Sequence, residues 1–150
     1  MVIIDRRIIT GLFLLLFMAT QSYAIGGTKS PKLHNTSVSR TMSKASEYVD
    51  QYKEAAMEQM RRYGIPASIT LAQGILESGS GQSELSRKGN NHFGIKATSS
   101  WLENGGSYLV YADDKPNEKF CQYASVADSY EHHSLFLKSN KRYSELFKVL

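Results

Sequence analysis

Apolar side chains recur every three or four residues from Ser43 to Tyr63, which predicts one stripe of an amphipathic helix. Gly64 follows and marks the C-terminal end of that helix. Pro66, a residue tolerated at the first position of a helix, opens a second apolar stretch that runs almost without interruption over residues 69–76. We therefore predict two consecutive helices. Because its apolar positions are nearly continuous, the second helix is expected to be buried.

The spacing of apolar residues changes in the second half of the domain. Residues 107–111 and 119–123 are short β-prone runs on either side of a turn-rich stretch, so they predict a hairpin. Ser125, with Asp128 three residues later, forms the sequence pattern of a capping box and starts a third helix. A fourth helix is expected to begin near Tyr143. The pattern predicts a mainly α fold with a small β-hairpin, an α+β domain.

The first residues of the chain form an export pattern. A charged start precedes an apolar run over residues 8–18, which is much shorter than the roughly 20 residues needed to span a bilayer. Small residues then lead to a cleavage site after Ala24. We interpret residues 1–24 as a signal peptide, 25–42 as a polar linker and 43–150 as the functional domain.

Export places the domain in the periplasm or outside the cell, with no stable membrane insertion after cleavage of the signal peptide. The lone cysteine, Cys121, has no second cysteine with which to form an internal disulfide and is expected to be a buried, inert thiol. The net charge of +4 is mild, and the basic residues are scattered, which argues against nucleic-acid binding. No cofactor and no metal site are predicted, and the sequence does not indicate an oligomeric state.

Glu77 is the strongest candidate for chemistry. It directly follows Ile75 and Leu76 at the C-terminal end of the second helix, and both desolvation and the helix dipole raise the pKa of a carboxyl group. A carboxyl that stays protonated near neutral pH can serve as the general acid in glycosidic bond cleavage. From its spacing alone, however, an exposed glutamate at a frayed helix end is the commoner interpretation.

A set of ordered motifs adds to this reading. They are residues 72–83 (AQGILESGSGQS), 90–96 (NNHFGIK), Trp101, 120–123 (FCQY) with Ser125, 129–137 (SYEHHSLFL), and Arg142-Tyr143 with Leu146-Phe147. Over residues 48–147 they resemble glycoside hydrolase family 73, which contains bacterial peptidoglycan N-acetylglucosaminidases related to the flagellar rod-associated muramidase domain. The resemblance implies a lysozyme-like fold and Glu77 as the catalytic acid.

The same resemblance implies which residues contact the glycan. Phe93 and Tyr123 fall in segments that line the sugar cleft of the family. Asn91 falls in the same segment as Phe93, and Trp101 and Tyr143 fall in other matched segments. We expect these five residues to bind substrate. The rings of Trp101 and Tyr108 could stack on sugar faces and are equally compatible with a place in the core.

The chain departs from the family pattern in two places. Members often carry a second glutamate in the hairpin, where this sequence has Asp113 and Asp114. Either aspartate is a candidate for the second catalytic group, and either is equally compatible with a role in the turn beside Pro116. Members also usually continue past the Leu-Phe segment, so the resemblance implies that this sequence is truncated at its C-terminus.

The function implied is hydrolysis of the β-1,4 bond between N-acetylglucosamine and N-acetylmuramic acid in peptidoglycan glycan strands. Two alternatives remain. A lytic transglycosylase uses the same fold and a single glutamate, but it closes the muramic acid onto itself. A non-catalytic wall-binding module would keep the cleft without turnover.

Overall fold

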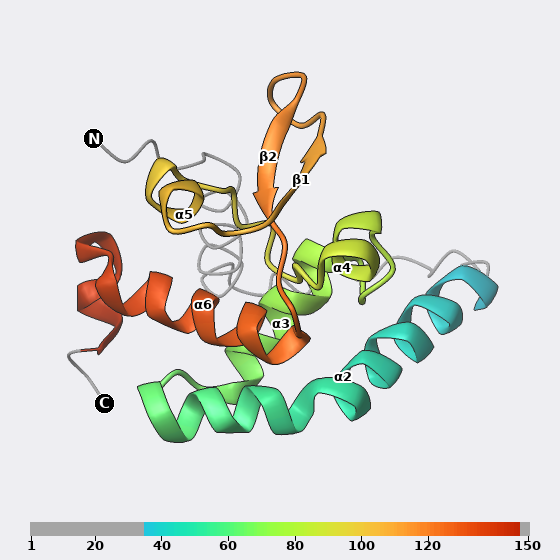
Figure 1. Cartoon of the computed structure of the whole chain (residues 1–150). Coiled ribbons are helices and arrows are strands. Elements are labelled where there is room, and N and C mark those ends of the chain that lie inside the picture. The colour runs from blue at the N-terminus through green and yellow to red at the C-terminus, as the bar shows by residue number, and fades with distance from the viewer. Residues whose placement is uncertain (1–34, 148–150) are drawn as a thin grey trace, which may run out of the picture. The chain divides into compact units, whose positions relative to one another are not determined.

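The computed structural model describes residues 35–147, so the predicted signal peptide and residues 25–34 of the linker lie outside the described residues. Residues 45–147 belong to one compact unit, which carries the features below, and the first residues of α2 belong to another. The elements are α2 (Asn35–Tyr63), α3 (Ala67–Ser78), α4 (Glu84–Gly89), α5 (Ser99–Glu103), β1 (Tyr108–Tyr111), β2 (Glu118–Cys121), α6 (Val126–Ser139) and the 3-10 helix η2 (Lys141–Phe147) (Figure 1).

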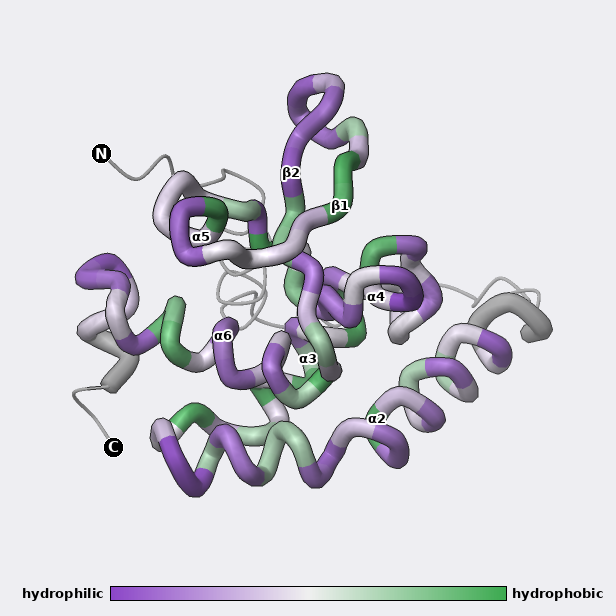
Figure 2. The backbone as a smooth tube through the Cα atoms, in the orientation of Figure 1, coloured by the Kyte–Doolittle hydropathy of each residue, from purple (hydrophilic) through white to green (hydrophobic). Residues whose placement is uncertain are grey.

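Helix α2 ends at Tyr63 before Gly64, as predicted, but it begins at Asn35 and not near Ser43. Residues 35–42 of the predicted linker are therefore helical. The sequence reading missed them because periodicity reports only which positions are buried, whereas a helix that has already formed extends by one hydrogen bond per added residue. Figure 2 shows that hydrophilic and hydrophobic positions alternate along α2.

Helix α3 begins after Pro66 and ends at Ser78, followed by Gly79 in the left-handed conformation. Its buried residues are Thr70, Leu71, Gln73, Gly74 and Ser78. The prediction of a wholly buried helix is wrong, because Ile69 and Leu76 keep 49% and 59% of their surface exposed. A continuous apolar run does not reveal which face of a helix is covered, so the exposed stripe could not be read from the sequence.

The predicted hairpin is confirmed. Strands β1 and β2 pair antiparallel, with Leu109 opposite Phe120. The other edge of β2 contacts residues 95–97, since the Ala97 N–H donates to the Lys119 carbonyl (2.9 Å) and the Cys121 N–H to the Ile95 carbonyl (2.9 Å). The loop that follows α4 is thereby fixed to the hairpin (Figure 1).

The capping box of α6 is also confirmed, with Ser125 and Asp128 making both reciprocal hydrogen bonds. The predicted fourth helix is a 3-10 helix. Between the helices lies a core that is rich in aromatic side chains; its buried members are Tyr48, Ala56, Leu71, Phe93, Ile95, Cys121, Tyr123 and Tyr130. A bilayer-crossing segment would need a longer and more apolar helix than any found between residues 35 and 147.

Candidate active site

Glu77 lies one residue before the end of α3, where the apolar run of the helix meets a glycine-rich turn. The predicted position at a helix C-terminus is confirmed. The predicted apolar surroundings are not, because Glu77 and its neighbour Leu76 are exposed. The reason is the same as for the rest of α3, whose buried face passes through Gly74 and Ser78. An exposed carboxyl group at a helix end is accessible to a large polymeric substrate.

The turn after Glu77 has an unusual backbone. Gly79, Ser80 and Gly81 all have positive φ, at 58°, 58° and 75°. Ser80 is the notable member, because a side chain disfavours that region. Its N–H donates to the Ile75 carbonyl at 2.8 Å, which fastens the turn to the last turn of α3.

The buried Ser78 holds the same turn from inside. Its hydroxyl donates to the Gly74 carbonyl (2.5 Å) and accepts a hydrogen bond from the Gly81 N–H (2.7 Å). The Ser83 N–H donates to the Ser78 carbonyl at 2.9 Å, and Ser83 then caps α4. The backbone on both sides of Glu77 is therefore fixed by hydrogen bonds, which is what a general acid needs in order to meet the leaving oxygen in one geometry.

The hairpin brings three carboxylates together. Asp113, Asp114 and Glu118 each place an oxygen within 4.8 Å of the others, which makes them the candidate metal ligands within the described part of the chain. The Lys96 ammonium pairs with all three, at 2.9 Å from Glu118, 3.3 Å from Asp113 and 3.6 Å from Asp114. The protein's own cation thus lies against the carboxylates, and the hydrogen bond from Lys96 lowers the pKa of Glu118.

Sequence reasoning selected Asp113 and Asp114 but missed Lys96 and Glu118. The side chains of Lys96 and Glu118 are only 24% and 18% exposed, respectively. One sequence feature could have pointed to Lys96, namely a charged residue between two apolar ones, Ile95 and Ala97. The segment that contains it runs along β2. The pairing itself joins residues 22 positions apart and could not be read from local spacing.

Replacing Lys96 with methionine is expected to lower the melting temperature at about pH 7 and to change it little at a pH below the lowered pKa of Glu118. The pKa of Glu118 is lowered from the ordinary 4.5, so its ion pair stabilises the fold above that value and is lost as the pH falls through the lowered pKa. Thermal unfolding at both pH values checks this. Lys119→Met is the matched control, because its ammonium lies over the Tyr108 ring. An equal loss at both pH values would instead show that the aliphatic stem of Lys96 is what matters.

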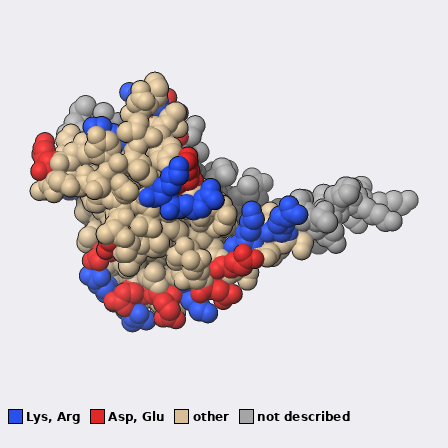
Figure 3. Space-filling view, turned by 45° about the vertical axis from the view of Figure 1, so that its right-hand side comes forward, with Lys and Arg blue, Asp and Glu red and all other residues tan. Residues whose placement is uncertain are grey.

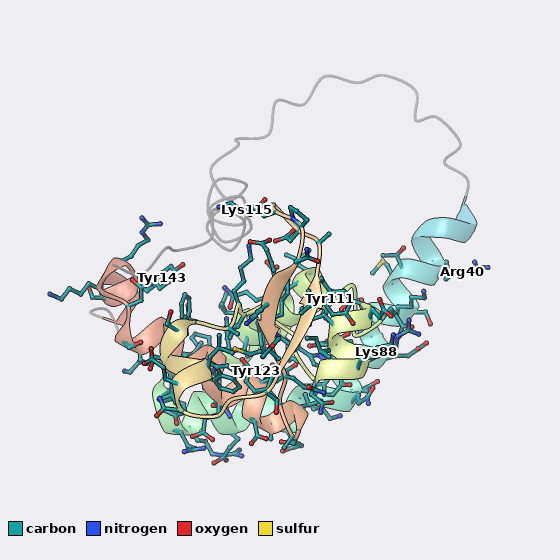
Figure 4. The ribbon with its side chains drawn as sticks, turned by 45° about the horizontal axis from the view of Figure 1, so that its top comes forward. Arg40, Lys88, Tyr111, Lys115, Tyr123 and Tyr143 are labelled. Carbon is teal, nitrogen blue, oxygen red and sulfur yellow. The ribbon has the colours of Figure 1, made fainter. Side chains whose placement is uncertain are left out.

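Most of the residues expected to line the sugar cleft are buried. Exposure is 2% for Phe93, 6% for Tyr123, 1% for Asn91 and 4% for Tyr143. The expectation that Phe93 and Tyr123 are exposed along a groove is wrong in this structure, because both rings pack in the core. Tyr143 is also not brought together with Tyr123, since it lies at the η2 end of the domain (Figure 4).

Asn91 and Phe93 have clear structural partners. The Asn91 amide donates to the Ile95 and Cys121 carbonyls, both at 2.9 Å, and its oxygen accepts from the Ile95 N–H at 3.1 Å. Phe93 stacks on His133 with ring centroids 3.9 Å apart. These contacts fasten the loop after α4 to β2 and α6.

Trp101 is the one of the five that stays half-buried. Its ring stacks on His132 at 5.3 Å, and its indole N–H donates to the Ser107 carbonyl at 2.8 Å. The Tyr123 hydroxyl in turn bonds to His132 Nδ1 at 2.8 Å. Burial lowers the pKa of His132, which favours a neutral ring in this stack. Trp101 is therefore the aromatic residue of the predicted set best placed to meet a sugar.

Neither a nucleophilic cysteine nor a nucleic-acid-binding surface is supported by the structure. Cys121 is fully buried, as predicted, and burial raises the pKa of its thiol to about 11, which disfavours a nucleophilic thiolate. On the face shown in Figure 3, acidic and basic side chains alternate along the lower edge and uncharged side chains cover most of the rest.

The sequence is similar to a known protein family and to named relatives within that class. Residues 53–149 match the model of a glucosaminidase family described as mannosyl-glycoprotein endo-beta-N-acetylglucosaminidase. The chain belongs to this family. It is 25% identical over 152 residues to the exo-glucosaminidase LytG of Bacillus subtilis, covering 95% of this chain and 52% of LytG. It is 32% identical over 105 residues to the peptidoglycan hydrolase FlgJ of Vibrio cholerae, covering 65% of this chain and 31% of FlgJ.

Solved structures of this glucosaminidase class agree in fold. The glycoside hydrolase domain of Salmonella typhimurium FlgJ matches with a TM-score of 0.57 and 30% identity, covering 67% of this chain and 64% of that one. A peptidoglycan hydrolase from Sphingomonas sp. A1 matches with a TM-score of 0.57 and 27% identity, covering 65% and 64% of the two chains. The predicted lysozyme-like α+β fold is confirmed. The chain spans about half the length of LytG and about a third of that of FlgJ.

Proposed function

We propose that this glucosaminidase domain hydrolyses the β-1,4 bond between N-acetylglucosamine and N-acetylmuramic acid in peptidoglycan, with Glu77 as the general acid. The observation that carries the proposal is an exposed carboxyl group at the end of α3, fixed by the hydrogen-bonded turn behind it and set in the motif that resembles the family's catalytic segment. Relatives named as peptidoglycan hydrolases support the choice of substrate.

In this mechanism Glu77 donates its proton to the glycosidic oxygen as the bond to the anomeric carbon breaks. Water then adds to that carbon and releases a proton to the solvent, from which Glu77 is protonated again, so the products are two shorter glycan strands. Of the two hairpin aspartates we favour Asp113 to orient the water. Its side chain is 20% exposed against 43% for Asp114, and Lys96 holds it at the shorter distance.

We also propose that the domain acts in the periplasm or outside the cell. The charged, apolar and small-residue segments of residues 1–24 support this, as does a substrate that lies outside the cytoplasmic membrane. Sequencing the N-terminus of protein recovered from an expressing bacterium tests the proposal. A mature start at Ile25 is expected, and a retained Met1 would contradict it.

The reaction is tested by digesting purified peptidoglycan and analysing the products by mass spectrometry. Reducing N-acetylglucosamine ends are the expected result. Anhydro-muramic ends would identify a lytic transglycosylase, and binding to the wall without any products would identify a wall-binding module. LytG is named an exo-enzyme, so the size of the products also matters. We expect the mixed lengths of an endo-acting enzyme and not single terminal units.

A further inference from the structure

A chain of buried hydrogen bonds lies behind the turn that follows Glu77. The Tyr130 hydroxyl, from α6, donates to the Tyr48 hydroxyl, from α2, at 2.9 Å. The Tyr48 hydroxyl lies 2.8 Å from Nδ1 of His92, in the loop after α4. Each of the three side chains is at most 2% exposed. Buried polar groups joined in this way hold their elements in one arrangement.

The direction of these bonds follows from protonation. Burial lowers the pKa of His92 to about 4, so its ring is neutral at neutral pH and Nδ1 can accept. Each tyrosine has a single proton to donate. Because Tyr130 gives its proton to Tyr48, the proton of Tyr48 is directed to His92.

Tyr48 also contacts the turn directly. Its side chain packs against Gly74 and Gly81, the two residues whose backbone groups are hydrogen-bonded to the Ser78 hydroxyl. A Cβ added at Gly74 would overlap the Tyr48 hydroxyl and lie 3.1 Å from its Cζ. One added at Gly81 would lie 3.4 Å from Cδ2 of the same ring. The Tyr48 ring therefore fits against two glycines, one on each side of Glu77 in the sequence.

The turn needs such support because three successive residues have positive φ and one of them, Ser80, is not glycine. A backbone of this kind persists only where its surroundings hold it in place. The Tyr48 side chain supplies a contact from α2, whereas the hydrogen bonds described above for the turn join residues 74–83 to one another.

We propose that Tyr48 is a positioning residue for Glu77. Through its packing against Gly74 and Gly81 it sets where the end of α3 holds the acid, and its bonds to Tyr130 and His92 fix its own hydroxyl. The inference rests on the proposed role of Glu77. Tyr48 does not touch the substrate, so its effect is confined to the step in which the proton is delivered.

Tyr48→Phe tests this. On peptidoglycan, kcat is expected to fall tenfold to a hundredfold, on the order of the cost of misplacing a catalytic group by about 1 Å, with KM little changed. On a chitooligosaccharide with a good aryl leaving group, the loss is expected to shrink to about twofold, because that bond breaks without a proton donor. Tyr52→Phe is the matched control. It lies one turn along α2, and its ring centroid is 4.6 Å from that of Tyr48.

The outcomes separate the possibilities. An equal loss of kcat on both substrates, or a Tyr48 variant that behaves like the Tyr52 variant, would overturn the inference. Should Tyr48→Phe fail to fold, Tyr130→Phe takes its place, because it removes only the outer donor. A smaller loss confined to the poor leaving group then supports the inference, and an unselective loss or no loss contradicts it. Full turnover of peptidoglycan by Glu77→Gln would instead overturn the proposed function.

Discussion

Glu77→Gln is expected to lower the cleavage of purified peptidoglycan by about 100- to 10,000-fold, the range typical of general-acid catalysis. The amide keeps the size of the carboxyl group but has no proton to donate to the leaving oxygen. Folding and wall binding should be nearly unchanged, because Glu77 is exposed and a negative charge at a helix C-terminus is unfavourable. The melting temperature should stay level or rise slightly. Release of reducing ends, together with thermal unfolding, measures both effects.

Three further variants serve as comparisons for Glu77→Gln. Glu103→Gln is the matched control, since Glu103 is an exposed glutamate at the last residue of α5, and it should leave turnover unchanged. Asp113→Asn and Asp114→Asn should have smaller effects than the Glu77 variant. Turnover at the wild-type rate in Glu77→Gln would contradict the proposed mechanism. Loss of turnover with a collapsed melting temperature would show that Glu77 is structural.

Asn91→Leu is expected to lower the free energy of unfolding by about 3 kcal/mol, because leucine fills a similar volume but leaves the Cys121 carbonyl and the Ile95 N–H without the Asn91 side chain as partner. The Ile95 carbonyl keeps its hydrogen bond from the Cys121 N–H. Each buried polar group stranded in this way costs about 1 to 3 kcal/mol. Denaturant unfolding followed by circular dichroism gives the value.

Asn104→Leu is the comparison for this variant. Asn104 is exposed, and its amide makes hydrogen bonds only within α5, so the change should stay within about 0.5 kcal/mol. The experiment also decides between two roles for Asn91. Unchanged stability with weakened binding to peptidoglycan would restore the sugar contact that the sequence motif implied.

Much of the fold was predictable because the signals for its ends are local. Gly64 and Pro66 separate the first two helices, and the Ser125–Asp128 pair starts α6 whatever the rest of the chain does. The hairpin followed from two β-prone runs around a turn. Such signals depend on hydrogen bonds between residues a few positions apart, so they survive in the sequence.

The site was less predictable because burial and pairing are properties of the assembled fold. The family resemblance selected Phe93 and Tyr123, and nothing in their spacing tells a ring that lines a groove from one that supports it from behind. Glu118 was missed because its partner, Lys96, lies on a different segment. The role of Tyr48 was hidden for the same reason, since it looks like any other member of an aromatic stripe on an amphipathic helix.

The stacking of Trp101 on His132 gives the protein an intrinsic optical probe. Trp101 is the only tryptophan in the sequence, so all of the indole emission comes from one place, between α5 and α6. Indole fluorescence changes when the ring is uncovered, when a neighbouring imidazole gains a proton or when a sugar covers its face. The emission of the unlabelled protein therefore reports on the surroundings of the Trp101–His132 stack alone.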